Sequence, residues 1–134
     1  MPWSPHILSI SGRSGFKLLV RPRRTASCSL KKRGRLCGLV WCKLSASEPV
    51  LADIYQMWVA PSARGLRAGF ALLDTAVQWA KSRQAACVRL GVTLTNEAAV
   101  RLYESYGFVP SGEPEPLREG SSLMSQTLVL DLAD

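Results

Sequence analysis

The sequence lacks the features that mark membrane-spanning, secreted and metal-binding proteins. It has no uninterrupted run of about 18 apolar residues and no short apolar stretch that leads to a cleavage site. It holds one histidine and four cysteines, and no two cysteines form a C-x-x-C pair. We therefore expect no membrane partner, no metal, and the reduced thiols of a cytoplasmic protein.

Two nucleotide-binding signatures are also missing. The P-loop pattern G-x-x-x-x-G-K-[ST] does not occur, and no G-x-G-x-x-G follows the first strand of a βαβ unit. Any phosphate-binding loop in this chain would therefore serve another kind of pyrophosphate carrier.

Acidic residues are absent from residues 1–47, which hold ten Lys and Arg, whereas the rest of the chain holds seven basic and ten acidic residues. The Ser-, Pro- and Arg-rich residues 1–27 show no sustained hydrophobic period, so we expect an irregular basic segment followed by one domain at 28–134. This segment could be a solvated arm or replaced start, an organelle transit peptide, or a nucleic-acid-binding arm. Because Phe16 is the one aromatic residue of 13–35, base stacking is unsupported and nucleic acid is not the expected partner.

From residue 35 onward the hydrophobic pattern alternates between strand-like and helical periods. Strand-like runs end at turn residues, and apolar residues recur every three or four positions in two further stretches. The first two strands should form an antiparallel hairpin, and the whole chain a mixed α/β sheet. We predict strands at 35–45, 51–59, 86–93 and 123–132, helices at 66–84 and 96–106, and a loop at 110–122.

The stretch WVAPSARGLRAGFALL, residues 58–73, joins a strand to a helix through small residues and arginines. The first N–H groups of a helix are unpaired, and small residues let an anion approach them. Arg64 and Arg67 would add side-chain charge suited to a pyrophosphate. The alternative is a plain turn in which the arginines are solvated, and the turn alone does not decide between the two.

In their order along residues 36–132, the motifs resemble the GNAT superfamily of acetyl-coenzyme A-dependent N-acetyltransferases. They are WVAP, RGLRAG, CVRLGV, Asn96 and RLYESYGF. The resemblance implies a mixed, mostly antiparallel central sheet flanked by helices, with acetyl-coenzyme A as co-substrate. It implies transfer of an acetyl group to a primary amine of a small molecule or peptide. The sequence departs from the family pattern at Arg67, where a glycine is expected.

The resemblance also implies roles for particular residues. Backbone groups of Met57 and Val59 would bind the pantetheine arm and polarise the thioester carbonyl. Asn96 would bond the pantetheine, and Tyr103, two helical turns further on, would protonate the departing thiolate. Asp53 stands where some relatives carry a glutamate that serves as the base. The pyrophosphate would be held by the backbone of Arg64, Gly65, Leu66, Arg67, Ala68, Gly69 and Phe70.

Residue chemistry alone leaves these roles open. Tyr103 is also consistent with a core tyrosine and Asp53 with an exposed strand-edge carboxylate, while Tyr55 and Glu48 are weaker candidates for the base. Residues 1–27 do not resemble the strand and helices that wall the acceptor pocket in this family. The alternative function is therefore a shortened domain that binds coenzyme A without efficient turnover, and an open sheet edge at LCGLVW would favour a homodimer.

Overall fold

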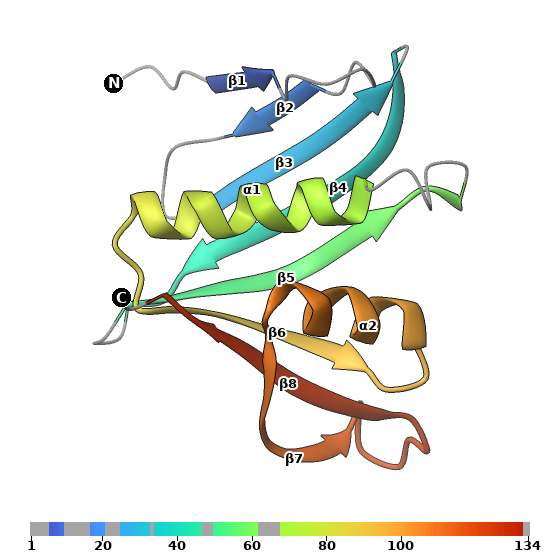
Figure 1. Cartoon of the computed structure of the whole chain (residues 1–134). Helices are drawn as coiled ribbons and strands as arrows, with labels where there is room; N and C mark the ends of the chain where they lie inside the picture. Colours follow the sequence, from blue (N-terminus) through green and yellow to red (C-terminus); the bar gives the residue numbers. More distant parts are fainter. Residues whose placement is uncertain are drawn as a thin grey trace.

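A computed structural model describes residues 6–9, 17–20, 25–32, 34–46, 50–61 and 68–132 of the chain. Within these residues eight strands form one sheet in the order β1-β2-β3-β4-β5-β6-β8-β7 (Figure 1). The elements are β1 (His6–Ser9), β2 (Lys17–Val20), β3 (Thr25–Lys32), β4 (Arg35–Leu44), β5 (Leu51–Val59), α1 (Ala68–Ser82), β6 (Cys87–Thr93), α2 (Glu97–Tyr106), β7 (Val109–Pro116) and β8 (Met124–Asp131).

The sheet is mixed and mostly antiparallel, as the resemblance implied. Among the described strands, β5 and β6 form the one parallel pair, and every other neighbouring pair is antiparallel. The predicted hairpin of residues 35–45 and 51–59 is confirmed as β4 and β5. The connection from β5 to β6 runs through α1, the crossover that a parallel pair requires.

Both helices lie on the same face of the sheet, α1 over β3 and β4 and α2 beside β6 and β8 (Figure 1). The three- and four-residue spacing of apolar residues in α1 turns one side of the helix toward the sheet. The helix residues that this arrangement buries are Ala68, Leu72, Leu73, Ala76, Val77, Trp79 and Ala80.

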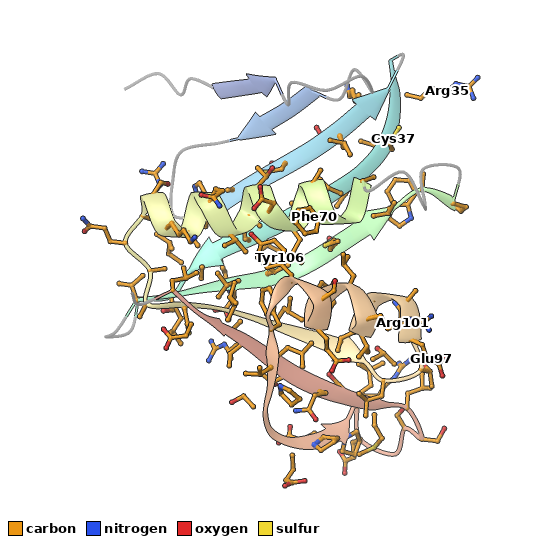
Figure 2. The ribbon with its side chains drawn as sticks, in the orientation of Figure 1. Arg35, Cys37, Phe70, Glu97, Arg101 and Tyr106 are labelled. Carbon is orange, nitrogen blue, oxygen red and sulfur yellow. The ribbon has the colours of Figure 1, made fainter. Side chains whose placement is uncertain are left out.

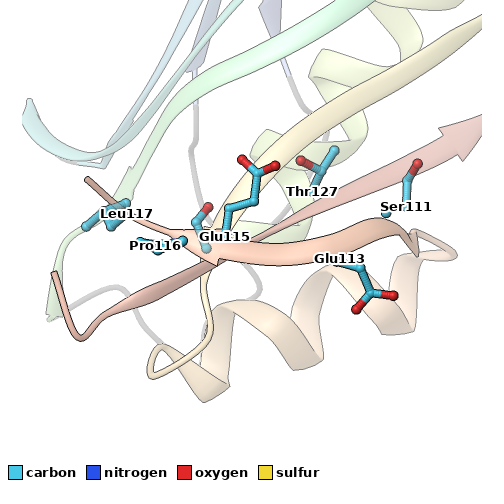
Figure 3. A pocket seen from close by; sticks show the side chains of 8 residues that line it. Ser111, Glu113, Glu115, Pro116, Leu117 and Thr127 are labelled. Carbon is cyan, nitrogen blue, oxygen red and sulfur yellow. The ribbon is translucent and has the colours of Figure 1, made fainter. Parts of the chain in front are cut away.

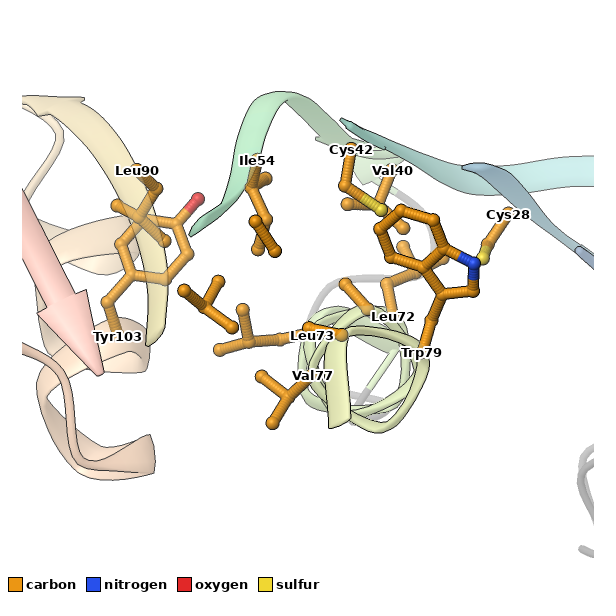
Figure 4. Packing of buried hydrophobic residues seen from close by; sticks show 14 of the residues in the cluster. Cys28, Val40, Cys42, Ile54, Leu72, Leu73, Val77, Trp79, Leu90 and Tyr103 are labelled. Carbon is orange, nitrogen blue, oxygen red and sulfur yellow. The ribbon is translucent and has the colours of Figure 1, made fainter. Parts of the chain in front are cut away.

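Gly38 of β4 lets α1 approach the sheet closely. A Cβ atom at this position would lie 2.7 Å from Leu72 Cδ1 and 2.8 Å from the carbonyl oxygen of Trp58. Trp79, Cys28 and Cys42 pack in the same layer between α1 and the sheet (Figure 4). This tightly packed part of the molecule, formed by α1, β3, β4 and the first half of β5, is called the α1 core below.

Two sequence predictions differ from the structure. β1, β2 and the start of β3 fall within residues 1–27, which we expected to be irregular, because four-residue strands such as KLLV are too short to show a hydrophobic period. The predicted loop at 110–122 begins with an exposed strand, β7, which carries three prolines. β7 lies at the edge of the sheet, where a strand tolerates proline because half of its N–H groups need no partner.

The expected open edge at LCGLVW is also wrong. These residues lie in β4, which pairs with β3 on one side and with β5 on the other. The edges of the described sheet are β1 and β7. The argument that β4 invites a second copy of the chain therefore no longer holds.

Candidate functional site

The parallel pair β5 and β6 opens partway along its length. The two strands pair from Leu51 with Cys87 to Ile54 with Leu90, whereas β5 continues to Val59 and β6 to Thr93 (Figure 1). A bulge in β5 marks the point of divergence, because Ile54 pairs with Cys42 and Gln56 with Trp41, which leaves Tyr55 as an extra residue. A bulge bends its strand and increases the local twist, and this one directs β5 away from β6.

A cavity of about 260 Å³ lies where the strands diverge. It is lined by both strands and by the start of α2, and we call it the β5–β6 cavity. Its lining residues are Ile54, Tyr55, Gln56, Met57, Leu90, Gly91, Val92, Thr93, Asn96, Ala99 and Tyr103.

The backbone of Met57 and Val59 faces this opening. The N–H group of Ala60 donates to the carbonyl oxygen of Cys37 at 2.7 Å, which makes Val59 and Gly38 a pair that exchanges no hydrogen bonds with each other. In an antiparallel ladder the N–H and C=O groups of Val59 and Met57 then point away from β4, toward the side where pairing with β6 has ended. These are the backbone groups that the resemblance assigned to the pantetheine arm.

Tyr103 reaches the same cavity from α2. Its side chain is 7% exposed, its ring packs against Phe108 with centroids 6.0 Å apart, and its hydroxyl points toward β5 (Figure 4). The hydroxyl lies 3.8 Å from Met57 Sδ, and a thioether is a weak acceptor. Burial raises the pKa of Tyr103, so the phenol keeps its proton at neutral pH and can donate it in the cavity.

Asn96 has a structural role that sequence reasoning missed. It is the N-cap of α2, and its Oδ1 accepts a hydrogen bond from the N–H of Ala99 at 3.3 Å. The same residue lines the β5–β6 cavity with Tyr103. Its capping bond uses the amide oxygen, and the amide nitrogen carries two further donors.

Asp53 lies outside the residues that line the cavity. Its carboxylate accepts two hydrogen bonds from the Arg89 guanidinium, from Nε to Oδ1 at 2.7 Å and from Nη2 to Oδ2 at 3.2 Å. The two residues are register partners in the paired half of β5 and β6. The hydrogen bond to Asp53 raises the pKa of Arg89, so the guanidinium stays charged. Asp53, the predicted base, therefore has a cationic partner. The pair lies before the bulge in β5, whereas Met57 lies after it.

The predicted pyrophosphate segment is described only in part. Arg64, Gly65, Leu66 and Arg67 lie outside the described residues, whereas Ala68, Gly69 and Phe70 open α1. A Cβ at Gly69 would lie 3.0 Å from Leu102 Cδ2 and 3.7 Å from Met57 Cε and Val59 Cγ2. The first turn of α1 therefore adjoins the side chains of Met57 and Val59, and Gly69 also provides room for Leu102 of α2.

A contact between the two helices was not found by sequence reasoning. The Tyr106 hydroxyl donates to Asp74 Oδ1 at 2.6 Å, and Phe70 and Tyr106 lie side by side between α1 and α2 (Figure 2). Burial and the bond to Asp74 raise the pKa of Tyr106. Asp74 and Tyr106 are 32 positions apart, and only the packing of α2 against α1 shows that they meet.

A second cavity of about 300 Å³ lies along β7 and β8. Figure 3 shows Glu115 and Thr127 on one side of this hairpin and Glu113 on the other, so the two carboxylates do not converge. Gln126 is buried and donates to the carbonyl oxygens of Ser111, Gly112 and Thr127 at 3.1 to 3.3 Å, which ties the irregular part of β7 to β8. No residue predicted for the site lines this cavity.

In the described part of the chain, no three His, Cys, Asp or Glu side chains are grouped so that they could hold a metal ion. None of the helices described here is long and apolar enough to cross a membrane.

The Acetyltransferase (GNAT) family matches residues 5–108 of the chain. The chain belongs to the GNAT acetyltransferase family. The family match begins before residue 28, so, like β1 and β2, it extends into the segment expected to be irregular. The family resemblance inferred from the motifs is thereby confirmed.

Individual relatives and structures agree with this assignment. A mycothiol acetyltransferase of Stackebrandtia nassauensis is 37% identical over 76 residues, which cover 56% of this chain and 25% of that protein. The structure of nourseothricin acetyltransferase has a TM-score of 0.76 at 20% identity and covers 98% of this chain and 85% of that one. A Bacillus anthracis protein in complex with acetyl coenzyme A has a TM-score of 0.74 at 24% identity and covers 83% and 64%. The chain spans about a quarter of the length of the mycothiol acetyltransferase.

Proposed function

We propose that this chain moves an acetyl group from acetyl-coenzyme A directly to a primary amine of a small molecule or peptide. The observation that carries the proposal is the β5–β6 cavity, which Met57 and Tyr103 line together, while the backbone groups of Met57 and Val59 point away from β4. Membership of the GNAT family supplies the acyl donor, whose thioester is an activated acetyl group.

The residues present fit such a donor. The N–H groups of β5 that point away from β4 can donate hydrogen bonds to a carbonyl oxygen and stabilise the negative charge that develops on it. The first turn of α1 lies against the same strand, and Arg64 and Arg67 precede it in the chain, which fits a pyrophosphate at the helix N-terminus. We assign to Asn96 a hydrogen bond to the pantetheine arm, because it lines the cavity and retains amide donors.

The reaction exchanges one bond for another. The amine nitrogen forms a bond to the acetyl carbon, the carbon–sulfur bond breaks, and the sulfur leaves as a thiolate that needs a proton. Tyr103 is the group that can supply it, because burial keeps its phenol protonated and the hydroxyl reaches the β5 side of the cavity.

The acceptor must also lose a proton, because a free primary amine with a pKa of about 10.4 arrives as an ammonium ion at neutral pH. Asp53 remains the predicted base for this step. Its ion pair with Arg89 and its position outside the cavity favour a structural role instead.

The experiment combines donor binding with turnover. Coenzyme A should raise the melting temperature of the chain through mass action, and phosphate-free pantetheine should do so far less. Arg64→Ala and Arg67→Ala should each reduce the coenzyme A shift. Arg83→Ala is the matched control, because Arg83 is exposed just after the other end of α1.

Amine-dependent release of the coenzyme A thiol from acetyl-coenzyme A then tests the reaction itself. Release with a mixed panel of primary amines supports the proposal. Coenzyme A binding without amine-dependent release from any of them supports the alternative, a domain that holds coenzyme A without efficient turnover.

A further inference from the structure

The face of the sheet opposite the helices carries a pair of aromatic side chains beside the β5–β6 cavity. Trp41 and Tyr55 are 42% and 52% exposed, and their ring centroids lie 5.9 Å apart at an interplanar angle of 64°. The Lys43 ammonium lies 5.9 Å from the centroid of the Tyr55 ring. Contiguous exposed apolar surface on a protein often marks a binding site.

The bulge in β5 connects this aromatic pair to the cavity. Tyr55 is the extra residue of the bulge, and Trp41 is the register partner of Gln56. Tyr55 and Gln56 both line the cavity, so the exposed aromatic surface and the cavity are continuous.

The opposite side of the cavity belongs to the donor site of the proposed function, on which this inference rests. Tyr103, Asn96 and Ala99 close the cavity on the helix face, and the first turn of α1 adjoins Met57 and Val59. An acceptor that reaches the thioester without displacing these groups approaches from the opposite face of the sheet, which carries Trp41 and Tyr55.

The charges on that face disfavour a polycation. Lys43, Asp53 and Arg89 are neighbours across three strands, and Asp53 is paired with Arg89, which leaves the ammonium of Lys43 next to Tyr55. Glu115, on the same side of the β7–β8 hairpin as Thr127, lies two strands beyond β6. No described carboxylate beside the aromatic pair is therefore available to hold a second ammonium group.

We propose that the acceptor is a monoamine joined to an aromatic ring, and that the ring packs on Trp41 and Tyr55 while the amine enters the β5–β6 cavity. Packing of one ring against two aromatic side chains removes apolar surface from water and adds the favourable geometry of aromatic pairs. A polyamine would gain none of this contact and would meet the charge of Lys43.

The test compares three amines with acetyl-coenzyme A as donor: phenethylamine, n-butylamine and spermidine. We expect kcat/KM to be about 10-fold or more higher for phenethylamine than for the other two, mainly through a lower KM. Trp41→Ala should lower kcat/KM for phenethylamine about 10-fold and leave KM for acetyl-coenzyme A unchanged. Trp58→Ala is the matched control, because Trp58 is equally exposed, whereas the ring that contacts Tyr55 is that of Trp41; this variant should behave as the parent chain.

A second measurement keeps the inference testable if Trp41→Ala unfolds or turnover is slow. Equilibrium dialysis should show that phenethylamine binds to the coenzyme A-loaded chain and that added spermidine does not reduce the bound amount. Transfer to spermidine in preference to phenethylamine would overturn the inference and leave the proposed function intact. Absence of phenethylamine binding would overturn it as well, whereas phenethylamine binding without turnover would count against the proposed function alone.

Discussion

The α1 core and the β5–β6 cavity share strand β5, which is fully paired in the first region and paired on one side only in the second. In the α1 core, β5 pairs with β4 and β6, apolar side chains are buried, and Gly38 lets the helix approach closely. Beyond Ile54, the strand keeps its pairing with β4 and loses its pairing with β6, and backbone groups, a phenol and an amide face a cavity. Tyr55 separates the two regions. The part of β5 before this inserted residue packs in the core, and the part after it faces the cavity.

The bulge also changes which residues face the helices. Before it, Ala52 and Ile54 are buried, and after it Met57 pairs with the buried Val40 and therefore lies on the helix face. An uninterrupted strand would have turned Met57 to the opposite face. The comparison predicts that substitutions in the α1 core change stability, whereas those in the cavity change turnover.

Gly38→Ala should have the largest effect on stability. The added methyl group would meet the backbone oxygen of Trp58 and the side chain of Leu72 below 3.0 Å, so α1 or the sheet must move. Overpacking of this kind costs about 1–3 kcal/mol in the free energy of unfolding, measured by urea titration. Gly91→Ala is the matched control in the cavity, because its Cβ would make an ordinary 3.6 Å contact with Ser125 Oγ. Equal losses in both variants would contradict the division between the two regions.

The buried thiols should make the α1 core sensitive to alkali. Burial raises the pKa of Cys28 and of Cys42 to about 12, with the neighbouring thiol contributing to the shift of Cys42. Thiols in the unfolded chain ionise near pH 8.5, so the unfolded state loses protons first and folded stability falls as the pH rises above about 9. The loss is up to about 1.4 kcal/mol per pH unit for each thiol.

The measurement is the urea midpoint between pH 8 and pH 10.5 under reducing conditions. The slope should become shallower in a Cys28→Ala/Cys42→Ala double variant, even if this variant is less stable at every pH. An unchanged slope would mean that these thiols ionise alike in the folded and unfolded states.

Tyr106→Phe tests the contact between α1 and α2, which lies at the border between the two regions. It removes the 2.6 Å bond to Asp74, which joins α2 to α1, and should lower the free energy of unfolding by about 1 kcal/mol. Because α2 carries Tyr103, kcat should fall by a few-fold with little change in the affinity for coenzyme A. A variant that loses stability but keeps full turnover would show that the bond does not position Tyr103.

Asp53→Asn should have the smallest effect if the ion pair with Arg89 is structural. Both side chains are partly exposed, so the pair contributes well under about 1 kcal/mol. Turnover should then stay within about two-fold across pH 6 to 9. A loss of about 100-fold or more that lessens at high pH, where the amine is already neutral, would identify Asp53 as the base instead.

The central strands and helices could be predicted because each has a long, regular hydrophobic pattern that ends at recognisable turn residues. Asn96 and Tyr103 could be placed together because they are seven residues apart on one helix. β7 was missed because its exposed, proline-rich sequence reads as a loop and only its place at the sheet edge explains it. β1 and β2 are too short for periodicity to show.

The contacts of the site depend on register, which the sequence does not reveal. Asp53 and Arg89 are 36 positions apart and meet because β5 and β6 pair with this alignment. Tyr55 gave no sign that it is the bulged residue, because the run LADIYQMWV is continuous in its strand character. The exposed pairing of Trp41 with Tyr55 follows from that bulge and could not be expected before it was seen.

The most direct test of the account is Tyr103→Phe. Its control is Tyr55→Phe, which removes a hydroxyl from an exposed tyrosine instead of a buried one. With an accepted amine, Tyr103→Phe should lower kcat by about 100-fold or more and leave the Kd for coenzyme A within a few-fold, because only protonation of the departing thiolate is lost. Tyr55→Phe keeps the aromatic ring that is proposed to contact the acceptor, so its kcat should stay close to that of the parent chain. Equal kcat in Tyr103→Phe and the parent would contradict the account, since the buried tyrosine of the β5–β6 cavity would then serve packing alone.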